Sequence, residues 1–242
     1  MLRALLDLPS IAADASRDVP MLRNGRVRGD LPAEPAELVV YVHGWLDWVT
    51  GRARDQAGAV AGALESEGHD AAVVGFTYPS NLPLWRSTKA VSTRKGRELG
   101  EWVADYRAAN PDTPVRLVAH SLGARAALAC LAELRERGER VRSCSLLGAG
   151  VGCDTVAEGG RYYEAVRDGA AVVHNYHLDW EFTLEVVYRP AELGERALGV
   201  RGVCGTPPDN YRDHDVTGSV SNHFTYLTED GGCLDRVIDD WE

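Results

Sequence analysis

Short apolar runs alternate with longer stretches of helical pattern along this chain. Each apolar run is rich in Val, Leu or Ala and holds few charges, which is typical of strands buried on both faces of a sheet. The predicted strands are residues 38–43, 71–76, 115–120, 141–150 and 171–178, with a weaker last strand at 199–205. The predicted helices are residues 52–67, 91–109, the stretch after Gly123, a segment around 155–168 and the terminal residues 233–241.

This alternation predicts the fold class. Parallel strands need crossover connections, and these connections usually hold a helix. We therefore expect an α/β protein whose mostly parallel, doubly wound sheet carries helices on both faces, in one domain that spans residues 1–242. Residues 1–37 hold four prolines and fit either an N-terminal arm or an edge hairpin.

The charge balance is strongly acidic, with 36 Asp and Glu against 26 Lys and Arg and a formal net charge of −10. Such a chain repels polyanions, so nucleic-acid binding is not expected. Only two of the basic residues, Lys89 and Lys95, are lysines. An acidic surface with few lysines fits adaptation to high salt, and a genome bias toward arginine codons explains the same composition equally well.

The sequence also bears on location and redox chemistry. No apolar run is long enough to cross a bilayer, so stable membrane insertion is not expected. The first twenty residues lack the pattern of a cleaved leader, which predicts a cytoplasmic protein. The five cysteines are odd in number, scattered and without a CxxC pair, which argues against a disulfide framework and against a zinc site. Cys130 and Cys144 stand in apolar runs and are expected to be buried.

Ser121 lies in the sequence AHSLG, where a predicted strand meets a predicted helix. A serine on such a turn is exposed above the end of the sheet, and the tight turn needs small neighbours, here Ala119 and Gly123. The N-terminus of the next helix offers its positive end to developing negative charge. The alternative is an ordinary turn in which the serine caps the helix.

A second turn of this kind lies upstream, where the strand at 38–43 runs into His43-Gly44-Trp45. The two segments, VYVHGW and LVAHSLGAR, resemble those of α/β-hydrolase esterases and lipases that have an AHSLG nucleophile elbow. The resemblance covers about residues 38–227 at the level of motif order. It implies an α/β-hydrolase fold and a serine hydrolase that cleaves carboxylic esters, with Ser121 as nucleophile. The backbone amides of Trp45 and Leu122 are then expected to form the oxyanion hole.

In such proteins the acid follows a later strand and the histidine comes near the C-terminus, in the chain order Ser, Asp, His. The predicted strand 171–178 ends in a pattern similar to the family's N-x-x-x-D, with Asn175 and Asp179 in those positions. Asp179 is therefore the expected acid, which would orient the histidine and stabilise its charged form. Asp154, on the loop after the preceding strand, is its rival.

The base is expected to be His223. Its sequence SNHFTYL resembles the GHxxY ending of this group of hydrolases, with Asn222 where a glycine is usual. His214 is the alternative base. It stands between Asp213 and Asp215, and these carboxylates are expected to favour its charged form and make it a poor base near neutral pH.

The resemblance thus predicts acyl transfer from a small-molecule ester through an acyl-enzyme, with no cofactor and no metal. Residues 80–85 and 180–188, together with Trp45 and Trp48, are expected either to line an acyl pocket or to cap the core. The other activities considered are those of a thioesterase or an amidase with the same triad. A non-catalytic binding module that keeps the scaffold is a further alternative, since fold alone does not fix function.

Overall fold

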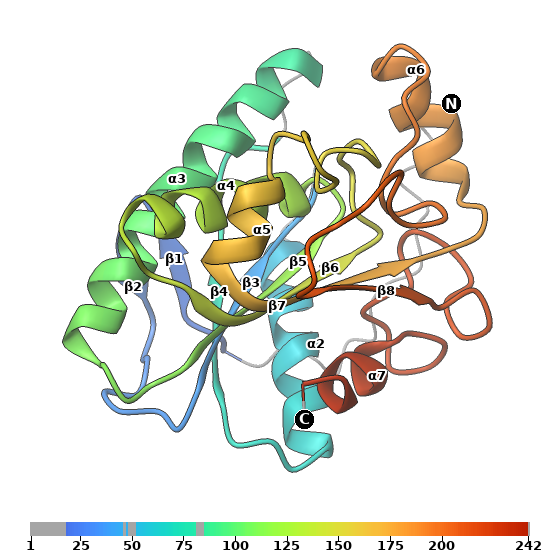
Figure 1. Ribbon diagram of the computed structural model, residues 1–242. Coiled ribbons are helices and arrows are strands. Elements are labelled where there is room, and N and C mark those ends of the chain that lie inside the picture. Colours follow the sequence, from blue (N-terminus) through green and yellow to red (C-terminus); the bar gives the residue numbers. More distant parts are fainter. Residues whose placement is uncertain (1–17, 46, 48–51, 81–84, 242) are drawn as a thin grey trace.

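The computed structural model describes residues 18–45, 47, 52–80 and 85–241. Within these ranges eight strands form one sheet in the order β2-β1-β4-β3-β5-β6-β7-β8 (Figure 1). The strands are β1 (Met21–Arg23), β2 (Arg26–Arg28), β3 (Leu38–Val42), β4 (Ala72–Phe76), β5 (Val115–His120), β6 (Val141–Leu147), β7 (Ala170–His177) and β8 (Tyr211–Asp215).

The sheet is parallel except at one edge. There β1 and β2 form an antiparallel hairpin, and β1 itself runs parallel to β4. The hairpin turns at Asn24 and Gly25, which both have positive φ, 50° and 71°, as two-residue hairpin loops require. At the centre, β3 pairs with β4 and β5 and is buried at every position, which explains its uninterrupted apolar sequence.

Helices cover both faces of the sheet. In Figure 1, α3, α4 and α5 lie on one face, and α2 and α7 lie on the other. This arrangement confirms the predicted fold class, a mostly parallel, doubly wound α/β sheet. The helical segments are α2 (Arg52–Ser66), α3 (Trp85–Ala109), α4 (Gly123–Glu136), α5 (Tyr163–Gly169), the π-helical η3 (Thr183–Tyr188), α6 (Arg189–Ala191) and α7 (Leu234–Asp239).

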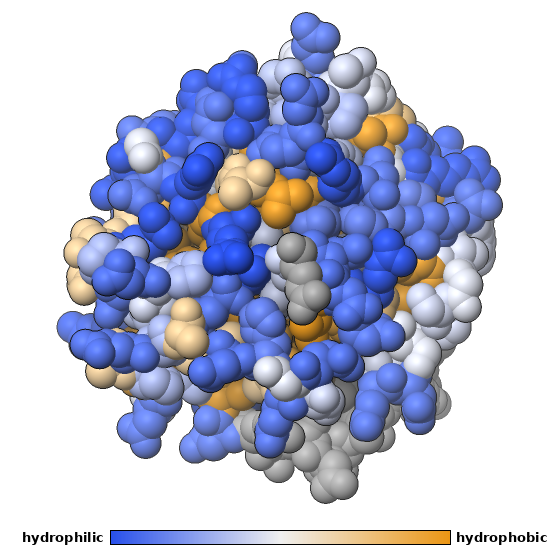
Figure 2. Space-filling model, turned by 60° about the horizontal axis from the view of Figure 1, so that its bottom comes forward, coloured by the Kyte–Doolittle hydropathy of each residue, from blue (hydrophilic) through white to orange (hydrophobic). Residues whose placement is uncertain are grey.

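Two large apolar clusters hold these layers together. Alternate residues of β3 point to opposite faces, so Val40 belongs to the cluster under α3, α4 and α5, whereas Tyr41 belongs to the cluster under α2 and α7. Figure 2 shows one face of the outer surface, where hydrophilic side chains cover most of the area and hydrophobic ones emerge in separate small spots. Within the described ranges, no helix is long and apolar enough to span a membrane.

The last strand lies elsewhere than the apolar pattern predicts. Residues 199–205 form no strand; Val200 makes a single β-bridge to Leu178, and its side chain packs in a small apolar cluster near Trp85. The strand is instead β8, with the polar sequence YRDHD. It lies at the edge of the sheet, where charged side chains can reach solvent, so burial does not impose an apolar pattern.

The cysteine prediction was wrong for one pair. Cys153 and Cys204 form a disulfide with Cα atoms 5.0 Å apart, between the loop after β6 and the loop before β8. These residues are 51 positions apart in the chain, so no local spacing indicates the pairing. Cys130 and Cys144 are free and buried, as predicted.

Candidate active site

Ser121 occupies the turn between β5 and α4. Its φ of +56° is a left-handed conformation that non-glycine residues rarely adopt. The strained turn is held by backbone hydrogen bonds, from Ser121 N–H to Leu147 O at 2.9 Å and from Ala124 N–H to Ser121 O at 3.1 Å. Ser121 remains partly exposed while the residues on either side of it are buried. The chain therefore presents this hydroxyl at the carboxyl end of the sheet.

Gly123 allows α4 to begin against the sheet. A Cβ atom at this position would lie 2.3 Å from the carbonyl oxygen of Val42. Any side chain here would push α4 away from β3 and move Ser121 with it. The small residue that the elbow sequence predicts is thus a steric requirement of the helix–sheet contact.

His223 lies beside the serine. Its Nε2 is 2.8 Å from Ser121 Oγ, and its Nδ1 is 3.2 Å from Oε2 of Glu181. The second contact is not aligned as a straight hydrogen bond, although its distance is that of an ion pair. The side chains of His223 and Glu181 are almost fully buried, with exposed fractions of 3% and 1%. A buried imidazole thus connects a hydroxyl to a carboxylate across the end of the sheet.

The carboxylate in this position corrects the sequence prediction of Asp179. The side chain of Asp179 is 71% exposed, and its nearest charged partner is Arg201 at 3.4 Å. The rival candidate, Asp154, is also exposed. Asp179 and Glu181 both follow β7, so the expected order of hydroxyl, carboxylate and imidazole in the chain is kept while the residue differs.

Glu181 is held as a carboxylate. Burial by itself would raise its pKa, but the contact with His223 and hydrogen bonds from two backbone amides outweigh burial, and the pKa lies below its ordinary value. The amides are those of Thr183 at 2.8 Å and Leu184 at 2.7 Å. They form the first turn of η3, so this helical segment fixes the charge and the position of the carboxylate.

His120 supports the loop that carries His223. Its Nε2–H donates to the carbonyl oxygen of His223 at 2.8 Å. Burial, together with the neighbouring charge of His223, lowers the pKa of His120 to about 3, so the ring is neutral. Asn222 accepts a hydrogen bond from the N–H of Phe224 at 2.9 Å and closes this turn with its side chain.

The turn after β3 lies directly against the serine. A Cβ atom at Gly44 would come 3.0 Å from Ser121 Cβ, so glycine lets the two turns meet. The amide of Gly44 donates to the buried carboxylate of Asp47 at 3.0 Å. His43 Nδ1 donates to Gly44 O at 2.8 Å, and its Nε2 accepts from the N–H of Tyr78 at 3.2 Å. Burial lowers the pKa of His43 to about 4, which keeps this pattern in place.

The two backbone amides predicted for the oxyanion hole are those of Leu122 and Trp45. Leu122 begins the turn into α4, and in the part of the chain that is described its N–H donates to no other group. A Cβ atom at Gly150 would lie 3.3 Å from the nitrogen of this amide, so glycine keeps a side chain away from it. Trp45 follows Gly44 at the adjoining turn, and its ring meets Trp85 edge to face, with centroids 5.7 Å apart. The assignment of both amides to an oxyanion hole stays a prediction.

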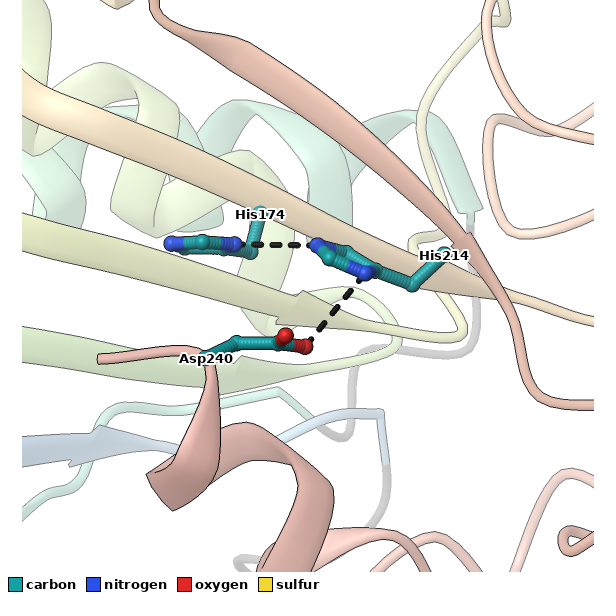
Figure 3. Close-up of side chains that lie close together, drawn as sticks. All are labelled: His174, His214 and Asp240. Atoms are coloured by element: carbon teal, nitrogen blue, oxygen red, sulfur yellow. Dashed lines mark hydrogen bonds and ion pairs between the residues drawn. The ribbon is translucent and has the colours of Figure 1, made fainter. Parts of the chain in front are cut away.

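The alternative base, His214, lies in another part of the sheet. It projects from β8 toward His174 of β7 and toward Asp240 after α7, as Figure 3 shows. Asp213 points to the opposite face and accepts hydrogen bonds from Asn175 and Tyr211. Burial, the largest effect, lowers the pKa of His214, so the predicted preference for its charged form is wrong.

Among the described residues, this same cluster has the arrangement that could hold a metal ion. His174 Nδ1 lies 3.0 Å from His214 Nε2, and Asp240 Oδ2 lies 3.3 Å from His214 Nδ1 (Figure 3). However, Asp240 Oδ2 already accepts from the hydroxyl of Tyr176 and from Arg236. Together with His214, these neighbours place three donors around a single oxygen of the Asp240 carboxylate. The geometry therefore fits a chain of hydrogen bonds between two strands and the C-terminal helix better than a cation site.

The apolar segments expected near the serine are described in part. Residues 81–84 and Trp48 lie outside the described residues. From the later segment, Leu184 and Tyr188 are buried in a cluster with Ala197 and Val200, and Trp85 packs against them. The neighbouring side chains of Trp180 and Phe182 remain 60% and 58% exposed. The segment 180–188 thus supplies a carboxylate, an apolar cluster and an exposed apolar edge.

The sheet order and the elbow are those of an α/β-hydrolase fold. A family model described as "Protein of unknown function (DUF726)" matches residues 82–238, and the chain belongs to this family. A comparison with curated proteins finds no match.

Several solved structures are similar to this chain. An uncharacterized protein from Bacillus cereus is 12% identical, with a TM-score of 0.50; the likeness covers 88% of this chain and 61% of that protein's length. TT1662 from Thermus thermophilus is 14% identical, with a TM-score of 0.48, covering 87% of this chain and 91% of that one. A lipase-esterase related protein from Clostridium acetobutylicum is 11% identical, with a TM-score of 0.46, covering 86% and 95%. At such identities the likeness concerns the fold alone.

Proposed function

We propose that this protein is a serine hydrolase that cleaves carboxylic esters, with Ser121 as nucleophile, His223 as base and Glu181 as the acid that orients His223. The observation that carries the proposal is the position of the buried His223 ring, 2.8 Å from Ser121 Oγ on one side and 3.2 Å from Glu181 on the other. A hydroxyl is a weak nucleophile until an adjacent base takes its proton, and this arrangement provides that base.

The chemistry follows from these contacts. Ser121 Oγ attacks the ester carbonyl carbon while its proton passes to His223 Nε2. Glu181 stabilises the imidazolium that forms, and the amides of Leu122 and Trp45 stabilise the negative oxygen of the tetrahedral intermediate. When that intermediate collapses, the ester C–O bond breaks and His223 gives its proton to the leaving alcohol. Water then repeats the sequence on the acyl-enzyme and releases the acid.

A fluorophosphonate probe tests the proposal directly. The wild-type chain should be labelled covalently and should hydrolyse p-nitrophenyl esters, whereas Ser121→Ala should lose labelling and about three orders of magnitude or more of the turnover. Ser66→Ala, an exposed serine at the end of α2, is the matched control. A wild-type chain that is folded but neither labels nor turns over esters would favour the non-catalytic binding module.

The ester class is the finer part of this proposal. Thioesters and amides could use the same three residues, and the choice depends on the pocket beside Ser121. The segment that carries Glu181 also supplies Leu184 and Tyr188 to a buried apolar cluster, and an apolar acyl group is the expectation from these surroundings. A series of p-nitrophenyl esters of increasing chain length, compared with the matching thioesters and anilides, ranks these substrates by kcat/KM.

The cytoplasmic location expected from the sequence stays a prediction, and the Cys153–Cys204 disulfide argues against it. Structural disulfides persist mainly in oxidising compartments.

A further inference from the structure

A groove lined with cationic side chains runs along the outer side of α3. Its volume is about 480 Å³. The described residues that line it are Lys89, Ala90, Thr93, Arg94, Arg97, Arg125 and Arg161. Five of these seven are cationic and none is acidic, in a chain whose net charge is −10. A cationic lining on so acidic a protein requires a physical explanation.

The lining comes from three parts of the fold. Lys89, Thr93 and Arg97 stand four residues apart on α3 and therefore share one side of that helix. Arg125 comes from the first turn of α4, and Arg161 from the loop before α5. Thr93, Arg97 and Arg161 also line a second, smaller cavity of about 160 Å³, so the groove continues across α4 toward α5.

Two of the guanidinium groups form no direct ion pair with a carboxylate of the described chain. Arg125 forms no ion pair there, and its Nε is buried without a hydrogen-bond acceptor. Arg161 makes a contact with the ring of Tyr162, 5.2 Å from its centroid, and no ion pair with a described residue. Leaving a buried donor of a charged group unsatisfied is costly, so an anion in the groove would satisfy a need that the protein does not meet.

The other three cations are paired to different degrees. Lys89 is tightly bound to Glu192 at 2.6 Å, which closes the end of the groove nearest Trp85. Arg94 lies 3.5 Å from Glu98, and Arg97 lies 3.5 Å from Glu133 and 3.6 Å from Glu136. Both arginines are about half exposed or more. Pairs this long and this exposed are weak, so both side chains retain N–H groups for a ligand.

We propose that this groove is a binding site for a phosphate-type group with two or more negative charges, held by Arg125 and Arg161 and flanked by Arg94 and Arg97. Several guanidinium groups around one open volume match the oxygens of a phosphate or diphosphate, which arginine binds through paired N–H donors. A single carboxylate could neutralise only one of the two guanidinium groups that form no ion pair, Arg125 and Arg161.

The site lies close to the candidate catalytic serine but does not depend on it. Arg125 follows Ser121 by four residues, about one helical turn away. Burial and the carboxylates of Asp154 and Glu192 raise the pKa of Glu195, and Arg125 opposes that rise. The charge of Arg125 thus already acts on the carboxyl group of Glu195. Anion binding can be measured whether or not the protein hydrolyses esters.

Calorimetric titration of the full chain with inorganic pyrophosphate at low ionic strength tests the site. We expect saturable binding that weakens as NaCl is added. Arg125→Gln/Arg161→Gln should lower the affinity at least tenfold. Arg26→Gln/Arg28→Gln removes the same charge from the exposed strand β2 and should change the affinity less than twofold. Because Arg125 is partly buried, the single change at the exposed Arg161 is measured as well and should weaken binding several-fold.

A second arm distinguishes a soluble phosphate from a lipid headgroup. Cosedimentation is measured with vesicles of phosphatidylcholine alone and with vesicles that also hold phosphatidic acid. Binding only to pyrophosphate assigns a soluble ligand, and binding to the acidic vesicles that is lost in the Arg125/Arg161 variant assigns a headgroup. The proposal is overturned if the wild-type chain binds neither probe, if the variant binds as well as wild type, or if the β2 control loses as much affinity.

Discussion

Glu181 and Asp179 stand two residues apart after β7, yet only Glu181 reaches His223. The difference lies in where the backbone turns. Glu181 begins the turn of η3, so the amides of Thr183 and Leu184 hold its side chain inward. Asp179 stands on the outside of the loop, where it meets Arg201.

The first prediction follows from this difference. Glu181→Gln keeps the shape of the side chain and removes its charge, so His223 loses the partner that stabilises its protonated form. We expect kcat/KM for a p-nitrophenyl ester to fall about 10⁴-fold, as for the equivalent change in a well-studied serine protease, while Asp179→Asn changes it less than about tenfold. Thermal melting of both variants controls for folding. A large loss for Asp179→Asn with little loss for Glu181→Gln would restore the assignment made from the sequence.

Among the individual residues of the candidate site, the sequence indicated the serine and the histidine but not the buried carboxylates. Ser121 and His223 stand in short motifs whose neighbours are dictated by a tight turn, and the structure places the two side chains in contact. The choice between two acids in one loop depends on which way each side chain points, and no local pattern records that direction. Asp47 was missed for the same reason, since its contact with the Gly44 amide is visible only once the turn is built.

The strands and helices differ in how far their own residues determine them. Buried strands such as β3 and β5 have sequences that fit no other environment, and their predicted bounds lie within a residue of those observed. The edge strand β8 has a polar sequence because one side of it faces solvent, and its pairing with β7 depends on a backbone contact that composition does not encode. Helix α3 begins at Trp85 rather than near residue 91, with the added turn carrying the ring that packs on Tyr188.

The second prediction concerns the disulfide that links two loops. It closes a loop of 51 residues that includes α5, β7 and η3, and the chain-entropy estimate for such a loop is about 4 kcal/mol. Cys153→Ser/Cys204→Ser should therefore lower the free energy of unfolding by about 2–4 kcal/mol in urea titrations. Cys130→Ala, at a buried free thiol, shows the cost of losing a thiol without a cross-link. Equal stability with and without dithiothreitol in the wild-type chain would mean that the cross-link does not form in solution.

The whole molecule buries several neutral histidines, and this makes its stability depend on pH. Burial is the main cause that lowers the pKa of His43 and His174 to about 4 and that of His120 to about 3, from an ordinary value of 6.5. The unfolded chain therefore takes up these protons first as the pH falls. Stability is thus full above about pH 6.5 and is lost between there and about pH 4 for His43 and His174, and down to about pH 3 for His120.

We expect the free energy of unfolding in urea to fall by about 1 kcal/mol per histidine for each pH unit within that window. The lowered pKa of Glu181 adds a further loss, but only at lower pH, as the pH falls below the ordinary carboxyl range. His174→Gln removes one titrating ring. The slope of the free energy of unfolding against pH should therefore decrease by the contribution of one proton. A stability that is flat between pH 7.5 and 5.5 would contradict the neutral state of these rings.

The charge of the whole molecule separates the two explanations of its composition. At neutral pH the net charge of −10 makes the surface repel itself, and salt near 1 M shortens the screening length to about 3 Å. If the acidic surface is an adaptation to salt, the melting temperature and the esterase rate should hold or rise as NaCl approaches molar concentration.

The same titration near pH 5.2, where the chain has its isoelectric point, is the control, because little net repulsion is left to screen there. A rise at pH 7.5 that disappears at pH 5.2 identifies charge repulsion as its cause. A chain that is most stable in dilute buffer at pH 7.5 would leave codon bias as the explanation of its arginines. In that case the relief of charge repulsion by salt would be smaller than the stability lost when salt weakens the surface ion pairs.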